Sequence, residues 1–294
     1  MIDLLLAPLA GALVILAIHA WLGLHVLARE IIFVDLAFAQ IAALGATIAG
    51  AAGAGHGSLT SFAVAFGFTL IGAALFTFTR FEHPRISQEA IIGVTFVVAS
   101  AAVLLVASRS AEGNEHVKET LTGTLLWVGW DEVGRLAAAY AVIGALHVLF
   151  RRPILAVSFA PRTLRHVRVW DFAFYVSFGL VITLSVEVAG VLLVFSMLVI
   201  PAAIALLFTA RTGLALLLAW LAGTLAITGG IAVSFVWDLP TGPTLVCAFG
   251  LTLVVAGVLR LVPRPGSATV HGVASVSGRE RWAGKVHAAA PPMR

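Results

Sequence analysis

The sequence has few of the residues that a soluble protein needs. Only 11% of its 294 residues are charged, whereas about a quarter of a typical soluble domain is charged. The single cysteine, Cys247, excludes an internal disulfide. The N-terminal segment, MIDLLLAPLAG, lacks the basic residues that precede the apolar core of a cleavable signal peptide. These shortages argue against a soluble domain and a disulfide-stabilised secreted one, and they favour a retained first helix.

The motifs of common enzymes are missing as well. The sequence has no G-x-x-x-x-G-K-[ST] phosphate loop, no H-E-x-x-H and no G-x-S-x-G, and one cysteine cannot form C-x-x-C. The nearest string to a phosphate loop, GRERWAGKV at 278–286, has one residue too many before Gly284 and a valine in place of the hydroxyl residue. We therefore expect neither an enzyme, nor ATP hydrolysis by this chain, nor a bound cofactor.

Long apolar runs are what the sequence contains instead. Hydrophobic residues make up 61% of the chain, and its mean hydropathy is +1.06. A run of about 20 apolar residues is long enough to cross a bilayer as a helix. We predict an all-α, polytopic membrane protein with about eight or nine transmembrane helices, from apolar runs at 4–27, 31–52, 59–79, 89–107, 133–150, 170–186, 188–208, 213–235 and 240–262.

Basic residues indicate the orientation and the domain organisation. Of the 18 Lys and Arg residues, 15 face the cytoplasm if the N-terminus lies outside the inner membrane and the C-terminus inside, as the positive-inside rule favours. The net charge of +4 then reflects membrane topology and not nucleic-acid binding. Residues 264–294 are basic, contain Pro, Gly and Ser, and are not apolar. We therefore predict a transmembrane domain at 1–263 and a flexible cytoplasmic tail at 264–294.

Acidic residues inside the apolar runs are the candidate functional residues. A charge at the bilayer centre costs about 2.5–3.5 kcal/mol on insertion scales, so it usually faces protein or a water-filled path. Asp35 and Glu187 are the strongest candidates for a polar pathway, with a buried structural hydrogen bond as the alternative for each. We interpret Glu30, Glu89 and Asp171 as helix-start residues that offset the N-terminal helix dipole.

Amide and imidazole side chains extend this set. A hard divalent cation favours carboxylate and amide oxygens, and zinc also accepts imidazole. Asp35 and Gln40 lie on one predicted helix. Their separation of five residues places them about 140° apart around the axis, so they do not face one ion together unless the helix is distorted. We interpret His19 and His25 as residues that hydrogen-bond within the bundle, with a role in transport as the alternative for each, and we predict that His147 lies at the membrane interface.

Four stretches carry a resemblance to a known family. VEVAGVLLVFSMLVIPAAIALLF at 186–208 matches the signature G-x-L-L-V-x-x-x-L-x-I-P-A-A. The others are QEAIIGVTF at 88–96, LTGTLLWVGWDEV at 121–133 and DLPTGPTLV at 238–246, and all four occur in the family order. The chain resembles the permease subunit of the metal-ion ABC importers, the zinc, manganese and iron uptake group. The resemblance covers nearly all of residues 5–262 and implies an ABC importer permease bundle.

The resemblance also implies an ion site, and the sequence departs from the family there. The family pattern is R-x-x-x-x-G-D-A-x-x-H-x-x-x-P-G, and its Asp and His are the expected ion ligands. Alignment from Arg29 places Asp35 on the Asp but Ala39 on the His, whereas alignment from Gly45 places Gln40 on the His. No gapless alignment keeps both ligands. The resemblance therefore implies Asp35 as the metal ligand and Gln40 as a weaker candidate.

The substrate and the partners also follow from the resemblance alone. It implies a divalent metal ion as the transported substrate. The transport unit would contain two copies of this chain in the lipid bilayer, two cytoplasmic ABC ATPase subunits and a periplasmic metal-binding protein. The segment VIPAAIALLFTAR, 199–211, ends on the predicted inner side. It supplies the candidates for contact with the ATPase, which are Pro201, Ala202, Ala203 and Arg211.

Two other functions remain open from the sequence. The first is a secondary transporter driven by an ion gradient, in which Asp35 and Glu187 relay protons. Such transporters usually have broken helices at matching positions of two repeats, and no convincing repeat is visible here. The second is a membrane scaffold that transports nothing, in which the same polar residues are only structural. The dependence of metal uptake on ATP and on an ATPase separates the three functions.

Overall fold

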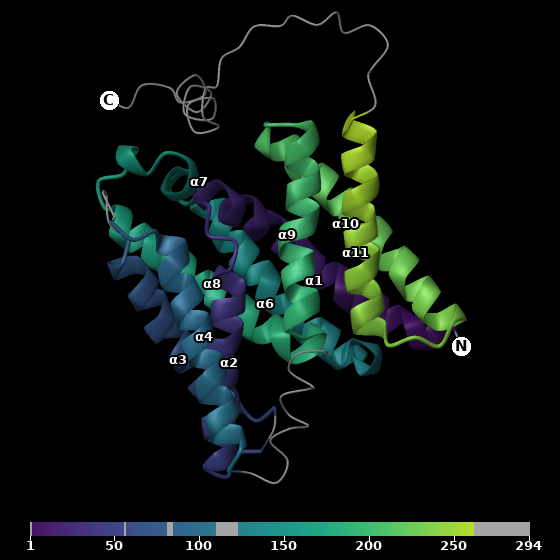
Figure 1. Cartoon of the computed structure of the whole chain (residues 1–294), viewed down its shortest axis with the longest axis horizontal. Helices are drawn as coiled ribbons and strands as arrows, with labels where there is room; N and C mark the ends of the chain where they lie inside the picture. Colours follow the sequence, from purple (N-terminus) through teal and green to yellow (C-terminus); the bar gives the residue numbers. More distant parts are fainter. Residues whose placement is uncertain (1, 56, 81–84, 110–122, 262–294) are drawn as a thin grey trace, which may run out of the picture.

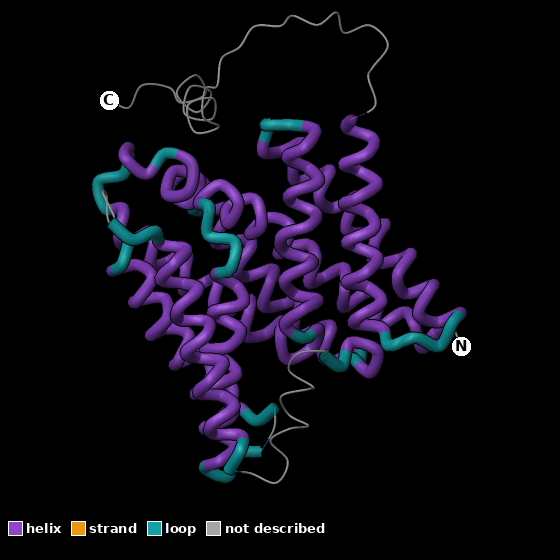
Figure 2. The backbone as a smooth tube through the Cα atoms, in the orientation of Figure 1, coloured by secondary structure: helices purple, strands orange, loops and turns teal. Residues whose placement is uncertain are grey.

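The regular structure of the chain is helical wherever it is described. The computed structural model describes residues 2–55, 57–80, 85–109 and 123–261 (Figures 1 and 2). The predicted tail at 264–294 lies outside these residues, so its separation from a transmembrane domain stays a prediction. In chain order the helices are α1 (Ile2–Arg29), α2 (Val34–Ala51), α3 (Leu59–Phe78), α4 (Gln88–Ala107), η1 (Leu125–Trp127), α6 (Trp130–Leu149), α7 (Arg151–Phe159), η2 (Pro161–Thr163), α8 (Val167–Ala189), α9 (Val191–Phe208), α10 (Thr212–Val236) and α11 (Thr241–Leu261).

Nine helices of the described residues are long and apolar enough to cross a membrane. They correspond one to one to the nine predicted runs, so the predicted fold class is confirmed. No boundary differs by more than three residues: α6 and α8 begin three residues before the predicted runs at 133 and 170, and α2 and α9 begin three residues after those at 31 and 188. The prediction worked because the length of an apolar run is set by the thickness of the bilayer and does not depend on tertiary contacts.

The helices form two groups with α1 passing between them (Figure 1). Helices α2, α3, α4 and α8 pack together on one side, and α9, α10 and α11 pack together with α1 on the other. More than half of α1, α2, α8 and α9 is buried, against less than a quarter of α4 and α11. The exposed faces of α4 and α11 carry large apolar residues such as Leu105 and Leu251. Such faces suit contact with lipid, because the backbone polar groups are satisfied within each helix.

Two short features lie between the spans. Helix α7 occupies a segment where the sequence predicted only a basic link, and its nine residues are too few to cross a membrane. Its Pro153 falls in the first turn, where a missing N–H breaks no helical hydrogen bond.

Helices α8 and α9 are joined by Gly190 alone, at φ +74°, a conformation that favours glycine. The apolar runs predicted this link at Glu187, whereas Glu187 lies in the last turn of α8.

Small residues allow the buried helices to approach closely. A Cβ atom on Gly45 of α2 would lie 2.7 Å from the Cα of Ala65 in α3. A Cβ atom on Gly23 of α1 would collide with the carbonyl oxygen of Leu198 in α9. Both contacts are with backbone atoms, which cannot rotate away as a side chain does. Glycine at these two positions therefore sets the distance between the helices.

Gly23→Ala tests this close contact between α1 and α9. We expect the free energy of unfolding to fall by about 1–3 kcal/mol or more, because the added methyl group forces the two backbones apart. Gly229→Ala in α10 is the matched control, since a Cβ atom there has nothing within 4 Å and alanine favours a helix. The measurement is the melting temperature of each purified variant in detergent. Equal melting temperatures for the two variants would show that the packing at Gly23 is not tight.

Candidate functional site

Asp35 lies in the first turn of α2, almost fully removed from solvent. Its exposed fraction is 2%, and its Oδ1 atom has no hydrogen-bond partner among the described residues. A buried carboxylate oxygen is costly unless it is paired or hydrogen-bonded. Asp35 is therefore a side chain that still has the capacity to bind a donor or a cation.

Glu89 brings a second carboxylate to the same place. It lies in the first turn of α4, as the sequence predicted, and its Oε1 accepts a hydrogen bond of 3.1 Å from the backbone N–H of Phe33 at the start of α2. Its Oε2 is buried without a hydrogen-bond partner among the described residues. The start of α2 thus holds two neighbouring carboxylates, each with an oxygen available to a cation.

Gln40 lies further along α2 and is also buried, with an exposed fraction of 8%. Helix α2 is a continuous α-helix, so Asp35 and Gln40 remain about 140° apart around its axis. Both are buried because α2 is in contact with α3, α4, α8 and α9. Their shared burial is therefore not evidence that they face one ion.

Glu187 lies toward the opposite end of the bundle. It is exposed in the last turn of α8, and a Cβ atom on Gly57 would lie 3.5 Å from its Oε1. Asp171 lies 16 residues earlier in α8, about 24 Å away along the axis, and it is bonded to Arg29 at the end of α1. Because α2 begins just after α1, Asp35 belongs to the Asp171 end. Asp35 and Glu187 therefore do not form one site.

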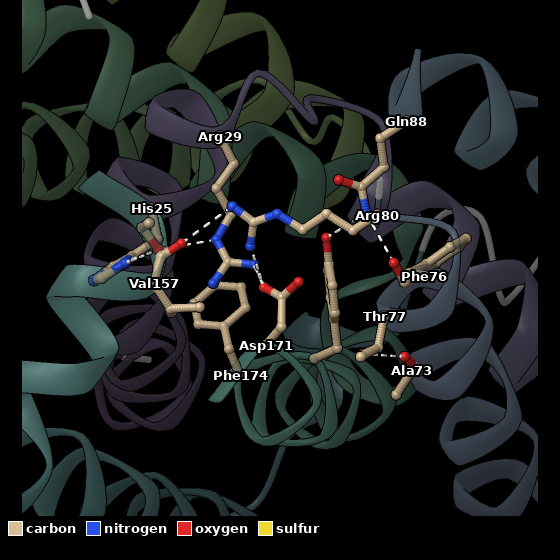
Figure 3. A network of polar contacts seen from close by, with 12 residues as sticks. His25, Arg29, Ala73, Phe76, Thr77, Arg80, Gln88, Val157, Asp171 and Phe174 are labelled. Atoms are coloured by element: carbon tan, nitrogen blue, oxygen red, sulfur yellow. Dashed lines mark hydrogen bonds and ion pairs between the residues drawn. The ribbon is translucent and has the colours of Figure 1, made fainter. Parts of the chain in front are cut away.

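A buried ionic cluster, which the sequence did not predict, lies at the Asp171 end. The Oδ1 atom of Asp171 accepts a hydrogen bond of 2.8 Å from Nη1 of Arg29 and another from Nη1 of Arg80 (Figure 3). The side chains of Arg29 and Asp171 are 3% and 2% exposed, whereas that of Arg80 is 24% exposed. One carboxylate thus binds two guanidinium groups, and these three residues have a net charge of +1. Removal of one partner from an ion pair this deeply buried is strongly destabilising, because it leaves an uncompensated buried charge.

Neighbouring groups engage the Arg29 guanidinium at its Nε and over one face, whereas its Nη2 has no hydrogen-bond partner among the described residues. Its Nε donates to Oγ of Ser158 in α7 at 2.9 Å, and the same oxygen lies 2.8 Å from Nδ1 of His25. Its Cζ lies 3.8 Å from the centre of the Phe174 ring, in cation–π geometry. The predicted hydrogen bonding of His25 within the bundle is confirmed. That of His19 is confirmed too, by a bond of 2.8 Å to the carbonyl oxygen of Ile15.

Two sequence interpretations of acidic residues are wrong. Asp171 does not act as a helix-start residue, because it lies beyond the first turn of α8 and pairs with two arginines. Glu30 does not begin a helix either. It follows the last residue of α1 and has a φ of +58°, in the left-handed region. Both residues were assigned from their neighbours in sequence, whereas the role of Asp171 depends on arginines from other parts of the chain.

His147 lies in the last turn of α6 and is buried in the bundle, with an exposed fraction of 4%. Its predicted place at the membrane interface stays a prediction. Trp21 of α1 donates its indole N–H to Nδ1 of His147 at 3.0 Å, so this nitrogen has no proton. Nε2 therefore has the proton and donates it to Oγ of Ser177 at 2.9 Å. The ring thus joins α1, α6 and α8.

The candidates for ATPase contact divide by exposure. Pro201 and Ala202 are buried inside α9, and Ala203 is half-buried. Arg211 is exposed in the link between α9 and α10. Burial places Pro201 and Ala202 out of reach of another protein in this conformation, so only Arg211 is fully available. The contact itself stays a prediction.

No group of three or more His, Cys, Asp or Glu side chains in the described ranges is arranged to hold a metal ion. Asp35 and Glu89 each have a buried carboxyl oxygen without a hydrogen-bond partner among the described residues. Carboxylates of this kind suit hard divalent cations.

Comparisons with known proteins agree on one family. Residues 1–260 match the model of the ABC 3 transport family. A probable metal transport system membrane protein of Chlamydia pneumoniae is 29% identical over 168 residues, 56% of this chain and 57% of the relative. The manganese transport system membrane protein MntC of Halalkalibacterium halodurans is 25% identical over 169 residues, 56% of this chain and 58% of the relative. The chain thus matches a little over half the length of each of these relatives.

A solved structure shares the fold. PsaBC of Streptococcus pneumoniae in complex with Fab aligns with a TM-score of 0.72 at 19% identity. The alignment covers 86% of this chain and 90% of that chain. At this identity the likeness concerns the arrangement of the helices, and it does not extend to individual ligands.

Asp171→Asn tests the buried ionic cluster. We expect the free energy of unfolding to fall by about 3–5 kcal/mol, because two arginines lose their counter-charge and Arg29 cannot reach water. Asp131→Asn is the matched control, since Asp131 is exposed in the first turn of α6. The measurement is the melting temperature and the yield of monodisperse protein after extraction in detergent. An Asp171→Asn protein as stable as the control would contradict the pairing described.

Proposed function

The chain belongs to the ABC 3 transport family, and from this premise we propose that it is the permease subunit of an ATP-binding cassette importer for divalent metal ions. The substrate would be zinc, manganese or iron. The observation that supports an ion path along α2 is the buried Asp35, whose Oδ1 has no hydrogen-bond partner among the described residues. An ionisable group at membrane depth usually faces an ion or substrate path.

Asp35 and Glu89 would determine which metal ions this path favours. Oxygen atoms of Asp35 and Glu89 would replace water molecules around a divalent cation, and the cation would balance their negative charge. The family histidine position is occupied by Ala39 in the alignment that keeps Asp35. An oxygen-rich site of this kind favours manganese over zinc, because zinc prefers sites with nitrogen or sulfur ligands.

The rest of the transport unit is also part of the proposal. Two copies of the chain would lie in the inner membrane with their N-termini outside, and a periplasmic binding protein would deliver the ion. Two cytoplasmic ATPase subunits would supply the energy by binding and hydrolysing ATP, and this chain would bind no cofactor of its own. Alternating access would then arise from rocking of the two permease copies.

Metal uptake into proteoliposomes tests the proposal against its alternatives. The vesicles hold this chain with its candidate ATPase and binding protein, and radiolabelled manganese or zinc is supplied outside. We expect uptake that requires both ATP and the ATPase. Uptake without either would indicate a secondary transporter, and no uptake of any metal would favour a scaffold.

Asp35→Asn probes the ion path. We expect uptake to fall by about tenfold or more, because an amide gives a divalent cation one neutral oxygen in place of a carboxylate. Insertion into the membrane and assembly with the ATPase should be unchanged, and both are followed by co-purification. Glu187→Gln is measured beside it, since Glu187 lies at the other end of the bundle. Loss of assembly with Asp35→Asn would instead support a structural role.

Arg211→Glu probes the predicted contact with the ATPase. Arg211 is exposed in the link between α9 and α10, and reversal of a charge at the rim of an interface mainly slows association. We expect a several-fold slower association with the ATPase in a binding assay at low ionic strength. Arg109→Glu, an exposed residue after α4 on the predicted outer side, should have no effect. Equal effects of the two changes would remove Arg211 from the interface.

A further inference from the structure

Helix α7 is a short helix bound to the bundle on the predicted cytoplasmic side. It lies between α6 and α8 at the same end of the bundle as the last residue of α11 (Figure 1). Ile154, Val157 and Ser158 are its buried residues, whereas Arg151 and Arg152 at its start are exposed. A helix this short has little stability of its own, because about 12–15 residues are needed even in favourable sequences. Its position therefore depends on what holds its inner face.

Three polar contacts hold that face, and all belong to the ionic cluster. His25 and Arg29 of α1 both contact Oγ of Ser158, at 2.8 Å and 2.9 Å. Nη2 of Arg80 donates to the carbonyl oxygen of Val157 at 3.2 Å, while its Nη1 binds Asp171 (Figure 3). The two arginines that fasten α7 are thus the same two that share the Asp171 carboxylate. The cluster joins α1, α7, α8 and the link that follows α3.

The link between α3 and α4 is attached at both of its ends. Arg80 near its start binds α7 and α8, as described above. Gln88 at the start of α4 donates to the carbonyl oxygen of Phe76 at 2.9 Å and to the hydroxyl of Tyr175 in α8 at 3.0 Å. The Gln88 contacts join α3, α4 and α8 without involving α7. Only Arg80 connects this link to α7 among the described contacts.

Arg80 can leave the cluster at a lower cost in free energy than Arg29 or Asp171. Removal of Arg29 or Asp171 from the cluster strands a buried charge, because their side chains are 3% and 2% exposed. Departure of Arg80 leaves Arg29 and Asp171 as a neutral pair, and its 24% exposed side chain already reaches solvent. A guanidinium group that leaves toward water recovers its hydration. Arg80 is therefore the one charged member that can leave the cluster reversibly.

We propose that Arg80 is a positioning residue for transport. While the cytoplasmic end of the bundle is closed, Arg80 binds Asp171 and holds α7 and the α3–α4 link together. When this end opens, Arg80 releases them. This rests on the proposed permease function, in which the cytoplasmic ends of the helices part during each cycle. The contacts at Ser158 keep α7 on α1, so the release divides the bundle between α7 and the α3–α4 link. Through this release, Arg80 couples ATP hydrolysis by the partner ATPase to opening of the ion path.

The release is tested on the purified chain in lipid nanodiscs, without metal or ATPase. In a Cys247→Ser background, Val157→Cys places one thiol on the buried face of α7 and keeps the backbone carbonyl that Arg80 binds, and a water-soluble maleimide reports its accessibility. We expect Arg80→Gln to raise the labelling rate several-fold, because α7 loses its contact with the link. Arg85→Gln is the matched control, since Arg85 is exposed in the same link. Equal labelling rates in the two variants would overturn the proposal.

A second measurement avoids the cysteine. Trypsin cleavage after Arg162, an exposed residue just beyond α7, is followed by mass spectrometry in the otherwise unchanged chain. We expect faster cleavage with Arg80→Gln than with Arg85→Gln at equal melting temperatures. Equal cleavage rates would count against release of α7.

The role in transport is tested in the reconstituted complex. Arg80→Gln should lower the number of metal ions transported per ATP hydrolysed several-fold, with ATPase assembly intact, and Arg80→Lys should recover part of that ratio because it keeps the charge. A merely structural role would lower uptake and ATP hydrolysis together and leave the ratio unchanged. If the wild-type complex transports no metal, the proposed function fails, and the labelling result still decides whether Arg80 holds α7.

Discussion

The arrangement of one end of the bundle, the predicted cytoplasmic end, depends on one carboxylate, that of Asp171. A charge buried in a membrane bundle must be paired, and Asp171 is paired twice, with Arg29 and Arg80. Each arginine also binds α7, through Ser158 or through the backbone of Val157. Four segments that are far apart in the sequence are thereby fixed relative to one another. Apolar packing alone would not specify this arrangement, because packing against lipid and packing against another helix differ little in hydrophobic energy.

Asp35 is the opposite case in the same bundle. It is as deeply buried as Asp171, but its Oδ1 has no hydrogen-bond partner among the described residues, and Glu89, which binds the start of α2, is also an acid. A paired carboxylate stabilises a frame, whereas an incompletely paired one favours the binding of a cation. The two aspartates therefore divide the functions that the fold requires. One fixes the helices, and the other supplies a binding group inside them.

The sequence predicted the spans and left the contacts between them undetermined. Each span is visible because about 20 apolar residues are needed to cross the bilayer, whatever the tertiary structure. The ionic cluster was invisible, because Arg29 and Asp171 are 142 residues apart and Arg29 was fully explained by the positive-inside rule. Helix α7 was missed for a related reason, since a basic segment with a proline looks like a link. Asp35 was identified correctly as a buried acid, but its neighbour Glu89 could be recognised only once α2 and α4 were seen to pack together.

The most direct test of this division is the metal-concentration dependence of uptake, measured together with ATP hydrolysis in the same proteoliposomes. The account predicts that Asp35→Asn changes the half-saturating metal concentration and the order of preference among metals. It predicts that Arg80→Gln leaves both of these unchanged and lowers the number of ions moved per ATP. Changes of the same kind in both variants, or an unchanged metal dependence with Asp35→Asn, would contradict the separation of an ion-binding carboxylate from a frame-fixing one.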